Sequence, residues 1–123
     1  MKLTAVMLGS ENAKALGDFY AKLFGTPEWN DGDWYGFDIG GSSLIIGPHS
    51  EVHGKNDAPG RIMFVLETED VKADFDKLKT AGAVVVAEPY KPAMDDKEGW
   101  LATLADLDGN FFQLATPWGE ASK

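Results

Sequence analysis

Few side chains in this sequence of 123 residues are placed to do chemistry, and two histidines are the first candidates. His49 and His53 flank Glu51, and imidazole with carboxylate is a common ligand set for zinc and similar ions. All three lie in residues 47–60, which are rich in glycine and proline and nearly free of apolar side chains. Because this composition is typical of a surface connection, and not of a helix that would bring the two rings together, we assign no metal site here.

Nucleophilic and phosphate chemistry have no sequence support either. The chain contains no cysteine, and therefore no thiolate nucleophile, thiolate metal ligand or disulfide. Neither a nucleophile elbow nor a phosphate-binding glycine loop occurs. Asp38, Asp106 and Asp108 would act as acids or bases only if buried, and carboxylates at hairpin ends are usually solvated. We predict no metal ligand and no cofactor, and we assign no catalytic residue.

Aromatic residues point instead to binding. Trp34 and Tyr35 stand at the start of one predicted hairpin and Trp100 at the start of another, with Trp29 and Trp118 in flanking segments. Flat rings suit a planar or amphipathic ligand, and if the ligand is positively charged, cation–π attraction strengthens the contact. The formal net charge of -9 favours such a cation and argues against nucleic acid or an anionic membrane as partner. The alternative for each ring is that it fills the core or a subunit interface.

Two polar residues extend this set. Gln113 lies between Phe111 and Ala115 on one face of the last predicted strand, as expected for a face that looks into a partly wet cavity. The alternative is an ordinary edge strand with Gln113 in solvent. Arg61, the only arginine, has the donor geometry to hold a carboxylate or phosphate, unless it pairs with a surface acid.

Local patterns predict the elements that must position these residues. Short apolar runs predict strands at 3–8, 34–39, 42–46, 61–66 and 83–87, and residues 99–117 predict a closing hairpin about Asp108-Gly109-Asn110 that ends at Pro117. Ser10-Glu11-Asn12 predicts a helix start with an acid in its first turn, and Gly25 its end. A second helix is expected from Thr68-Glu69-Asp70 to Gly82, with Val71, Phe75 and Leu78 buried.

The two halves of the chain repeat each other, roughly over residues 1–48 and 60–117. Each half predicts a β-α-β-β-β module. We expect one α+β domain in which two curved antiparallel half-barrel sheets enclose a cleft, with the helices outside. Six residues should point into that cleft: Ala5, Met7, Met63, Val65, Phe111 and Gln113. No run is long and apolar enough for a membrane span or signal peptide, and we expect a cytoplasmic protein.

Two motifs carry a resemblance to a known family. Residues 18–25, Asp-Phe-Tyr-Ala-Lys-Leu-Phe-Gly, and residues 106–114, Asp-Leu-Asp-Gly-Asn-Phe-Phe-Gln-Leu, resemble the first-helix ending and closing hairpin of the vicinal oxygen chelate superfamily. That superfamily includes glyoxalase I, extradiol dioxygenases, fosfomycin resistance proteins and bleomycin-binding proteins. The resemblance implies the paired-module fold and a homodimer, but no single reaction.

In metal-dependent relatives, the resemblance implies four ligand positions on cleft-facing strands. These fall at Ala5, at Ile45 or Ile46, at Met63 or Arg61, and at Gln113. Only Gln113 has a donor, and an amide oxygen is a weak ligand for divalent cations. A catalytic metal is therefore not expected.

We predict metal-independent binding or sequestration of a small, partly aromatic molecule, neutral or cationic, as in bleomycin-binding relatives that confer antibiotic resistance. The expected ligand-binding residues are Met7, Trp34, Tyr35, Arg61, Met63, Trp100, Phe111 and Gln113. One alternative is a glyoxalase-like lyase or isomerase with Gln113 or an acid as polar catalyst. Another is a scaffold without a small ligand.

Overall fold

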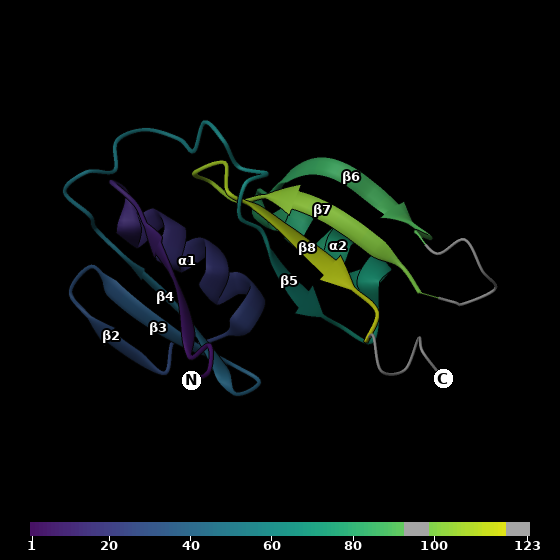
Figure 1. Cartoon of the computed structure of the whole chain (residues 1–123), viewed down its shortest axis with the longest axis horizontal. Helices are drawn as coiled ribbons and strands as arrows, with labels where there is room; N and C mark the ends of the chain where they lie inside the picture. The colour runs from purple at the N-terminus through teal and green to yellow at the C-terminus, as the bar shows by residue number, and fades with distance from the viewer. Residues whose placement is uncertain (93–98, 118–123) are drawn as a thin grey trace. The chain divides into compact units, whose positions relative to one another are not determined.

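A four-stranded sheet with one helix against it occurs twice along the chain (Figure 1). The computed structural model describes residues 1–92 and 99–117, so Trp118 lies outside the described residues. The chain divides into two compact units between Lys55 and Asn56, and each is described by itself. We call them the first and second modules.

The first module runs β-α-β-β-β. Its elements are β1 (Ala5–Gly9), α1 (Ala13–Phe24), β2 (Trp29–Asp31), β3 (Trp34–Ile39) and β4 (Ser42–Gly47). The strand order in the sheet is β1-β4-β3-β2, with β1 parallel to β4 and the other neighbours antiparallel. The hairpin between β3 and β4 turns at Gly40 and Gly41, whose φ angles of 65° and 100° are favourable only for glycine.

Helix α1 covers one face of this sheet with the predicted apolar side chains. Leu16, Phe19 and Tyr20 are fully buried, and Gly25 ends the helix by donating its N–H to the carbonyl of Ala21. The predicted start was wrong in detail. Asn12 caps the helix without a side-chain hydrogen bond, and no acid lies in the first turn. Ser10 instead follows β1: it donates its N–H to the Gly47 carbonyl, and its hydroxyl accepts the N–H of Asn12.

The second module repeats the same order. Its elements are β5 (Phe64–Glu67), α2 (Val71–Ala81), β6 (Val84–Tyr90), β7 (Leu101–Ala105) and β8 (Phe111–Ala115). The strand order β5-β8-β7-β6 matches that of the first sheet, with β5 parallel to β8. The duplicated α+β module is thus confirmed. Both sheets are mixed and not antiparallel throughout, because the first strand of each module lies parallel to its last.

Helix α2 follows its predicted signals closely. The Asp70 carboxylate accepts the N–H of Ala73 at the start, and Gly82, with a φ of 112°, closes the end. Val71, Phe75 and Leu78 are buried as predicted. Strand β5 begins at Phe64, so the predicted strand 61–66 starts three residues too early, and Arg61 lies in the turn before it.

The closing hairpin is confirmed, and a carboxylate organises its turn. Asp106 is only 3% exposed. Its Oδ1 accepts the N–H groups of Asp108 and Asn110 at 2.9 and 3.0 Å, and its Oδ2 accepts the Asn110 side-chain amide at 3.0 Å. Gly109 supplies the positive φ of 81° that lets the chain reverse. Among the described residues, no helix has the length and apolarity to cross a membrane.

Candidate functional site

Each sheet buries one face under its own helix and leaves the other face uncovered within its module. We call the uncovered faces the first and second open faces. Since alternate residues of a strand point to opposite sides, the strand registers assign each side chain to a face. The first open face carries Ala5, Met7, Trp29, Trp34, Gly36, Ile45 and Gly47. The second carries Val65, Glu67, Thr103, Phe111, Gln113 and Ala115.

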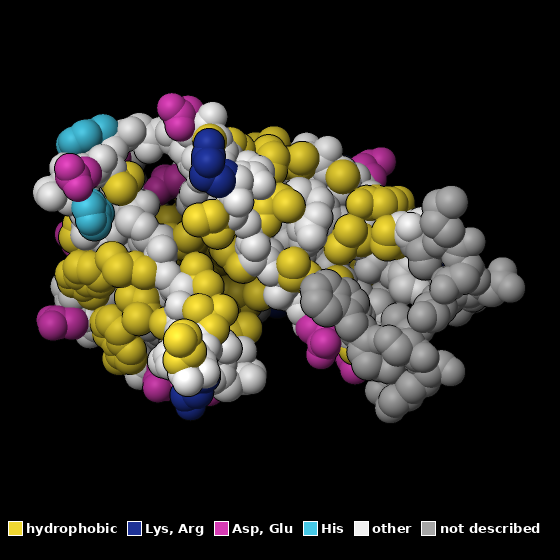
Figure 2. Space-filling model, viewed as in Figure 1, with side chains coloured by type: hydrophobic (Ala, Val, Ile, Leu, Met, Phe, Trp, Pro, Cys, Tyr) yellow, Lys and Arg dark blue, Asp and Glu magenta, His cyan; other side chains and the backbone are white. Residues whose placement is uncertain are grey.

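Two tryptophans of the first open face lie on glycines of the neighbouring strands. A Cβ atom added to Gly47 would come within 2.2 Å of Trp34 Cε3, and one added to Gly36 within 2.2 Å of Trp29 Cε2. Any larger residue would occupy the space of the indole. The two rings therefore lie close against the sheet backbone. Figure 2 shows apolar side chains gathered over the region where Figure 1 places β2 and β3.

A row of apolar residues crosses all four strands of the first sheet. Trp29 pairs with Gly36, Gly36 with Ile45, and Ile45 with Met7. The ends of the row are 42% exposed at Trp29 and 48% at Met7. Exposure of large apolar side chains side by side on one face is typical of a surface that binds a partner or ligand.

Tyr35 does not share this face. It is 6% exposed and lies on the α1 side of the sheet, where a Cβ atom added to Gly17 would come within 2.7 Å of its ring. It lies on the same face of β3 as Phe37, which is also buried against the helix. Tyr35 is thus a core residue of the first module, contrary to its predicted place beside Trp34.

The second open face has a polar pair in an apolar surround. The Gln113 side-chain amide donates to the Thr103 hydroxyl at 3.1 Å, and the two residues lie directly opposite each other on β8 and β7. Val65 lies across from Gln113 on the other side. The bond holds the amide in one orientation, with Thr103 buried and Gln113 half-buried. Phe111, also half-buried, is its neighbour along the same face.

Trp100 is engaged by cations of the protein itself. The Lys72 ammonium, on α2, lies 3.8 Å from the centre of the ring, and the Lys91 ammonium lies 5.2 Å away. Because Lys72 comes from α2, this tryptophan belongs to the helix side of the second module. We predicted that this ring attracts a cationic ligand by a cation–π interaction, but lysines of the protein itself already make that interaction.

The remaining predicted ligand residues lie just before β5. Met63 is 39% exposed and precedes the strand, and Arg61 is exposed in the turn, where its N–H donates to the Ala58 carbonyl. Arg61 forms no ion pair with any residue that the structure describes. It thus keeps the free guanidinium that recognition of an anion would need.

Among the residues at the predicted metal-ligand positions, only Gln113 has an oxygen atom that could coordinate a metal ion. Ile45 faces the open side, whereas Ile46 is fully buried toward α1, and the register places Val65, not Met63, across from Gln113. Apolar side chains and a single neutral amide oxygen do not fit a divalent ion. Across residues 1–92 and 99–117, no three His, Cys, Asp or Glu side chains gather as a metal site would require.

The two histidines have local partners in the connecting segment. His49 Nδ1 accepts the N–H of Glu51, and His53 Nδ1 lies 3.9 Å from the Glu11 carboxylate. Glu11 also accepts the N–H of Gly54 at 2.8 Å. These contacts attach residues 49–54 to the start of α1 and do not converge on a common point.

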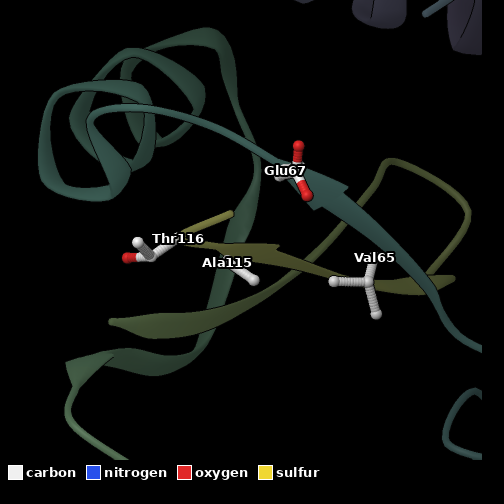
Figure 3. Close-up of a pocket in the computed structure, with 4 residues that line it drawn as sticks. All are labelled: Val65, Glu67, Ala115 and Thr116. Carbon is white, nitrogen blue, oxygen red and sulfur yellow. The ribbon is translucent and has the colours of Figure 1, made fainter. Parts of the chain in front are cut away.

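Two of the hollows on the surface are lined by described residues. One, of about 70 Å³, lies on the second open face and is lined by Val65, Glu67, Ala115 and Thr116 (Figure 3). The other, of about 480 Å³, is a wide depression at the start of α1. Its walls include Lys14 and Asp18, which form an exposed ion pair at 2.9 Å. The hydrogen bond that the Lys14 ammonium donates to the Asp18 carboxylate raises the pKa of Lys14, and the negative charge of Asp18 adds to this effect.

Sequence reasoning missed four residues of these faces. Gly36 and Gly47 had a usable signal, since a glycine inside a strand often marks close approach of another group. Thr103 and Glu67 had none, because only the strand register brings them next to Gln113 and Ala115.

Comparison with known proteins gives a consistent result. A model of the glyoxalase-like domain matches residues 5–115. Three similar solved structures are a glyoxalase/bleomycin resistance protein/dioxygenase family enzyme from Burkholderia phytofirmans PsJN, a glyoxalase-related enzyme from Fulvimarina pelagi and a glyoxalase/bleomycin resistance protein from Albidiferax ferrireducens T118.

Their similarity to this chain is one of fold. The first has 20% identity and a TM-score of 0.74, covering 94% of this chain and 98% of its own. The second has 19% identity and a TM-score of 0.77, covering 94% and 88%. The third has 19% identity and a TM-score of 0.71, covering 92% and 97%. A search of curated proteins finds no significant match.

Proposed function

The chain belongs to the glyoxalase-like domain family of the vicinal oxygen chelate superfamily, and on that premise we propose that it binds and sequesters a small, partly aromatic molecule without a metal ion. The ligand lies against an open sheet face. The observation that carries this proposal is the pair of indoles, Trp29 and Trp34, held against Gly36 and Gly47 on the first open face. The names of the similar structures support it at the level of the superfamily, which combines binding proteins and enzymes.

The physical argument begins with preorganisation. An indole held against the backbone has lost its rotamer freedom on folding, so a ligand that stacks on it does not bear that entropy cost. Stacking of aromatic rings contributes about 0.5–1.5 kcal/mol beyond the burial of apolar area. Ile45 and Met7 continue the surface across the sheet, and methionine adapts its shape to different ligands. This combination favours planar molecules with an apolar edge, and it supports a role in sequestration or drug resistance.

The test uses two planar probes and matched tryptophan variants. Isothermal titration calorimetry with proflavine, a planar cation, and anthracene-9-carboxylate, a planar anion, measures Kd for the wild type and for Trp29→Ala, Trp34→Ala and Trp100→Phe. We expect Trp34→Ala to weaken the better probe about tenfold, which corresponds to about 1.4 kcal/mol. Trp100→Phe is the control, because Trp100 lies on the α2 side under Lys72.

The same titrations test whether binding requires a metal ion. The Kd of each probe should be unchanged in the presence of EDTA, because the side chains proposed to contact the ligand need no divalent ion. If neither probe binds the wild type more tightly than about 1 mM, or if Trp29→Ala and Trp34→Ala bind as well as Trp100→Phe, the proposal is wrong. A loss of binding in EDTA that is restored by added metal would contradict metal independence.

A homodimer remains part of the proposal. In each sheet, among the described residues, the two outer strands pair on one side only, and unpaired strand edges favour association with a further strand. Sedimentation equilibrium at micromolar concentration should give twice the chain mass of 13.3 kDa. A single species at the monomer mass would refute it.

A further inference from the structure

The hollow on the second open face is bordered by a carboxylate that none of the roles above uses. Glu67, the last residue of β5, forms one wall of the hollow of about 70 Å³, and Val65, Ala115 and Thr116 form the rest (Figure 3). It is large enough to admit a small polar group such as an ammonium, with the rest of a ligand lying on its apolar rim.

The strand register places Glu67 on the open face. Glu67 pairs with Ala115, and Val65 pairs with Gln113. Phe64 and Leu66 alternate with them and are less exposed, and the Phe64 ring stacks on buried Phe112 with centroids 5.5 Å apart. The Glu67 side chain is thus directed away from α2 and toward the same side as the bond between Gln113 and Thr103.

In the described parts of the chain, no cation compensates this carboxylate. The Glu67 side chain is exposed, and its carboxylate forms no hydrogen bond or ion pair with any described residue. Its neighbours Val65 and Ala115 are apolar, and charged residues are depleted in strands. A charge beside an apolar wall recognises a ligand that has a cationic head next to a hydrocarbon part, because each half then meets a matching surface. The negative net charge of the chain attracts the same class of molecule.

We propose that Glu67 is a binding residue for the ammonium group of a small organic amine, whose apolar part lies against Val65 and Ala115. The carboxylate accepts charge-assisted hydrogen bonds from the ammonium, and these are stronger than bonds between neutral groups. Gln113, held by Thr103, lies on the same face of β8 two residues before Ala115, and its amide oxygen is a further acceptor on this face. The inference rests on the proposed function, since it requires that ligands reach the second open face.

The competing explanation is that Glu67 protects an exposed strand edge from association. Strand β5 is an edge of its sheet, and charged residues on edge strands prevent pairing with other chains. In that case Glu67→Gln would change association of the protein but not its preference between cationic and neutral ligands.

The experiment compares two probes of the same shape that differ in charge. Benzylamine, an ammonium at neutral pH, and benzyl alcohol, which is neutral, are titrated into protein with labelled methyl groups, and shifts are followed by NMR at Val65 and Ala115. We expect benzylamine to bind the wild type at least fivefold more tightly than benzyl alcohol. In Glu67→Gln this ratio should fall to about one, with the affinity for benzyl alcohol unchanged.

Glu69→Gln is the matched control, because Glu69 is an exposed glutamate two residues further on and does not line the hollow. It should keep the wild-type ratio. An unchanged ratio in Glu67→Gln, or shifts that avoid Val65 and Ala115, would overturn the inference. That result leaves the proposed function intact if proflavine still depends on Trp34. If no probe of either experiment binds, the proposed function fails as well.

Discussion

Trp34 lies on Gly47 so closely that a single added methyl group would come within 2.2 Å of the indole. Trp29 and Gly36 repeat the arrangement on the next pair of strands. A glycine inside a strand normally destabilises it, since it leaves the backbone bare and has no side chain to pack. Here the indole covers the bare backbone. One contact thus stabilises the sheet and holds an aromatic ring flat on the open face.

The first prediction concerns these glycines. Gly47→Ala and Gly36→Ala should each lower the free energy of unfolding by about 1–3 kcal/mol, because the new methyl group must displace a ring that lies directly on the sheet backbone. The emission maximum of the protein should shift to longer wavelength as the indole moves into water. Urea unfolding followed by tryptophan fluorescence measures both effects.

Gly60→Ala is the control for these variants. A Cβ atom at Gly60 meets nothing within 4 Å, and its φ lies outside the left-handed region. This variant should be as stable as the wild type or slightly more so. Equal stabilities of Gly60→Ala and Gly47→Ala would show that Trp34 does not depend on its glycine.

The second prediction concerns the bond between Gln113 and Thr103. A double-mutant cycle with Gln113→Leu and Thr103→Val should give a coupling energy of about 0.5–1.5 kcal/mol in unfolding, because each single variant leaves the other group without its partner. Gln113→Leu with Thr116→Val, which does not share this bond, is the control cycle and should be additive. Equal coupling in the two cycles would contradict a specific bond.

The third prediction concerns the closing turn. Asp106→Ala removes the acceptor for two backbone N–H groups and one side-chain amide, and we expect a loss of about 2–4 kcal/mol in the free energy of unfolding. Asp38→Ala provides the comparison, because Asp38 accepts a single exposed N–H, that of Gly41, at 3.2 Å. Its loss should stay below about 1 kcal/mol. Thermal and urea unfolding of the two variants should differ accordingly, and similar losses would contradict the role given to Asp106.

Much of the fold was predictable because its signals are local. Glycine turns, the Asp70 cap and the spacing of Val71, Phe75 and Leu78 depend on residues within a few positions of one another. The errors occurred where the structure depends on pairing between residues that are distant along the chain. The predicted strand 61–66 began too early, because Arg61 and Met63 alternate as strand residues do, but pairing with β8 begins only at Phe64.

The candidate site was less predictable, and Trp34 and Tyr35 show why. Both are aromatic neighbours, so alternation along the strand cannot decide which of them faces the helix. The register of β3 places Tyr35 on the helix side, where Gly17 has no side chain and leaves room for the ring, and it places Trp34 on the open face.

The amino-acid sequence by itself determined the duplicated β-α-β-β-β order, both ends of α2, the C-terminal end of α1 and the family, because each of these depends on neighbouring residues or on a repeated motif. Only the tertiary structure decided which rings lie on glycines, that Thr103 holds Gln113, and that Glu67 borders a hollow with Ala115. Those relationships join strands that are distant along the chain. Strand register sets them, and register depends on the packing of the whole sheet against its helix.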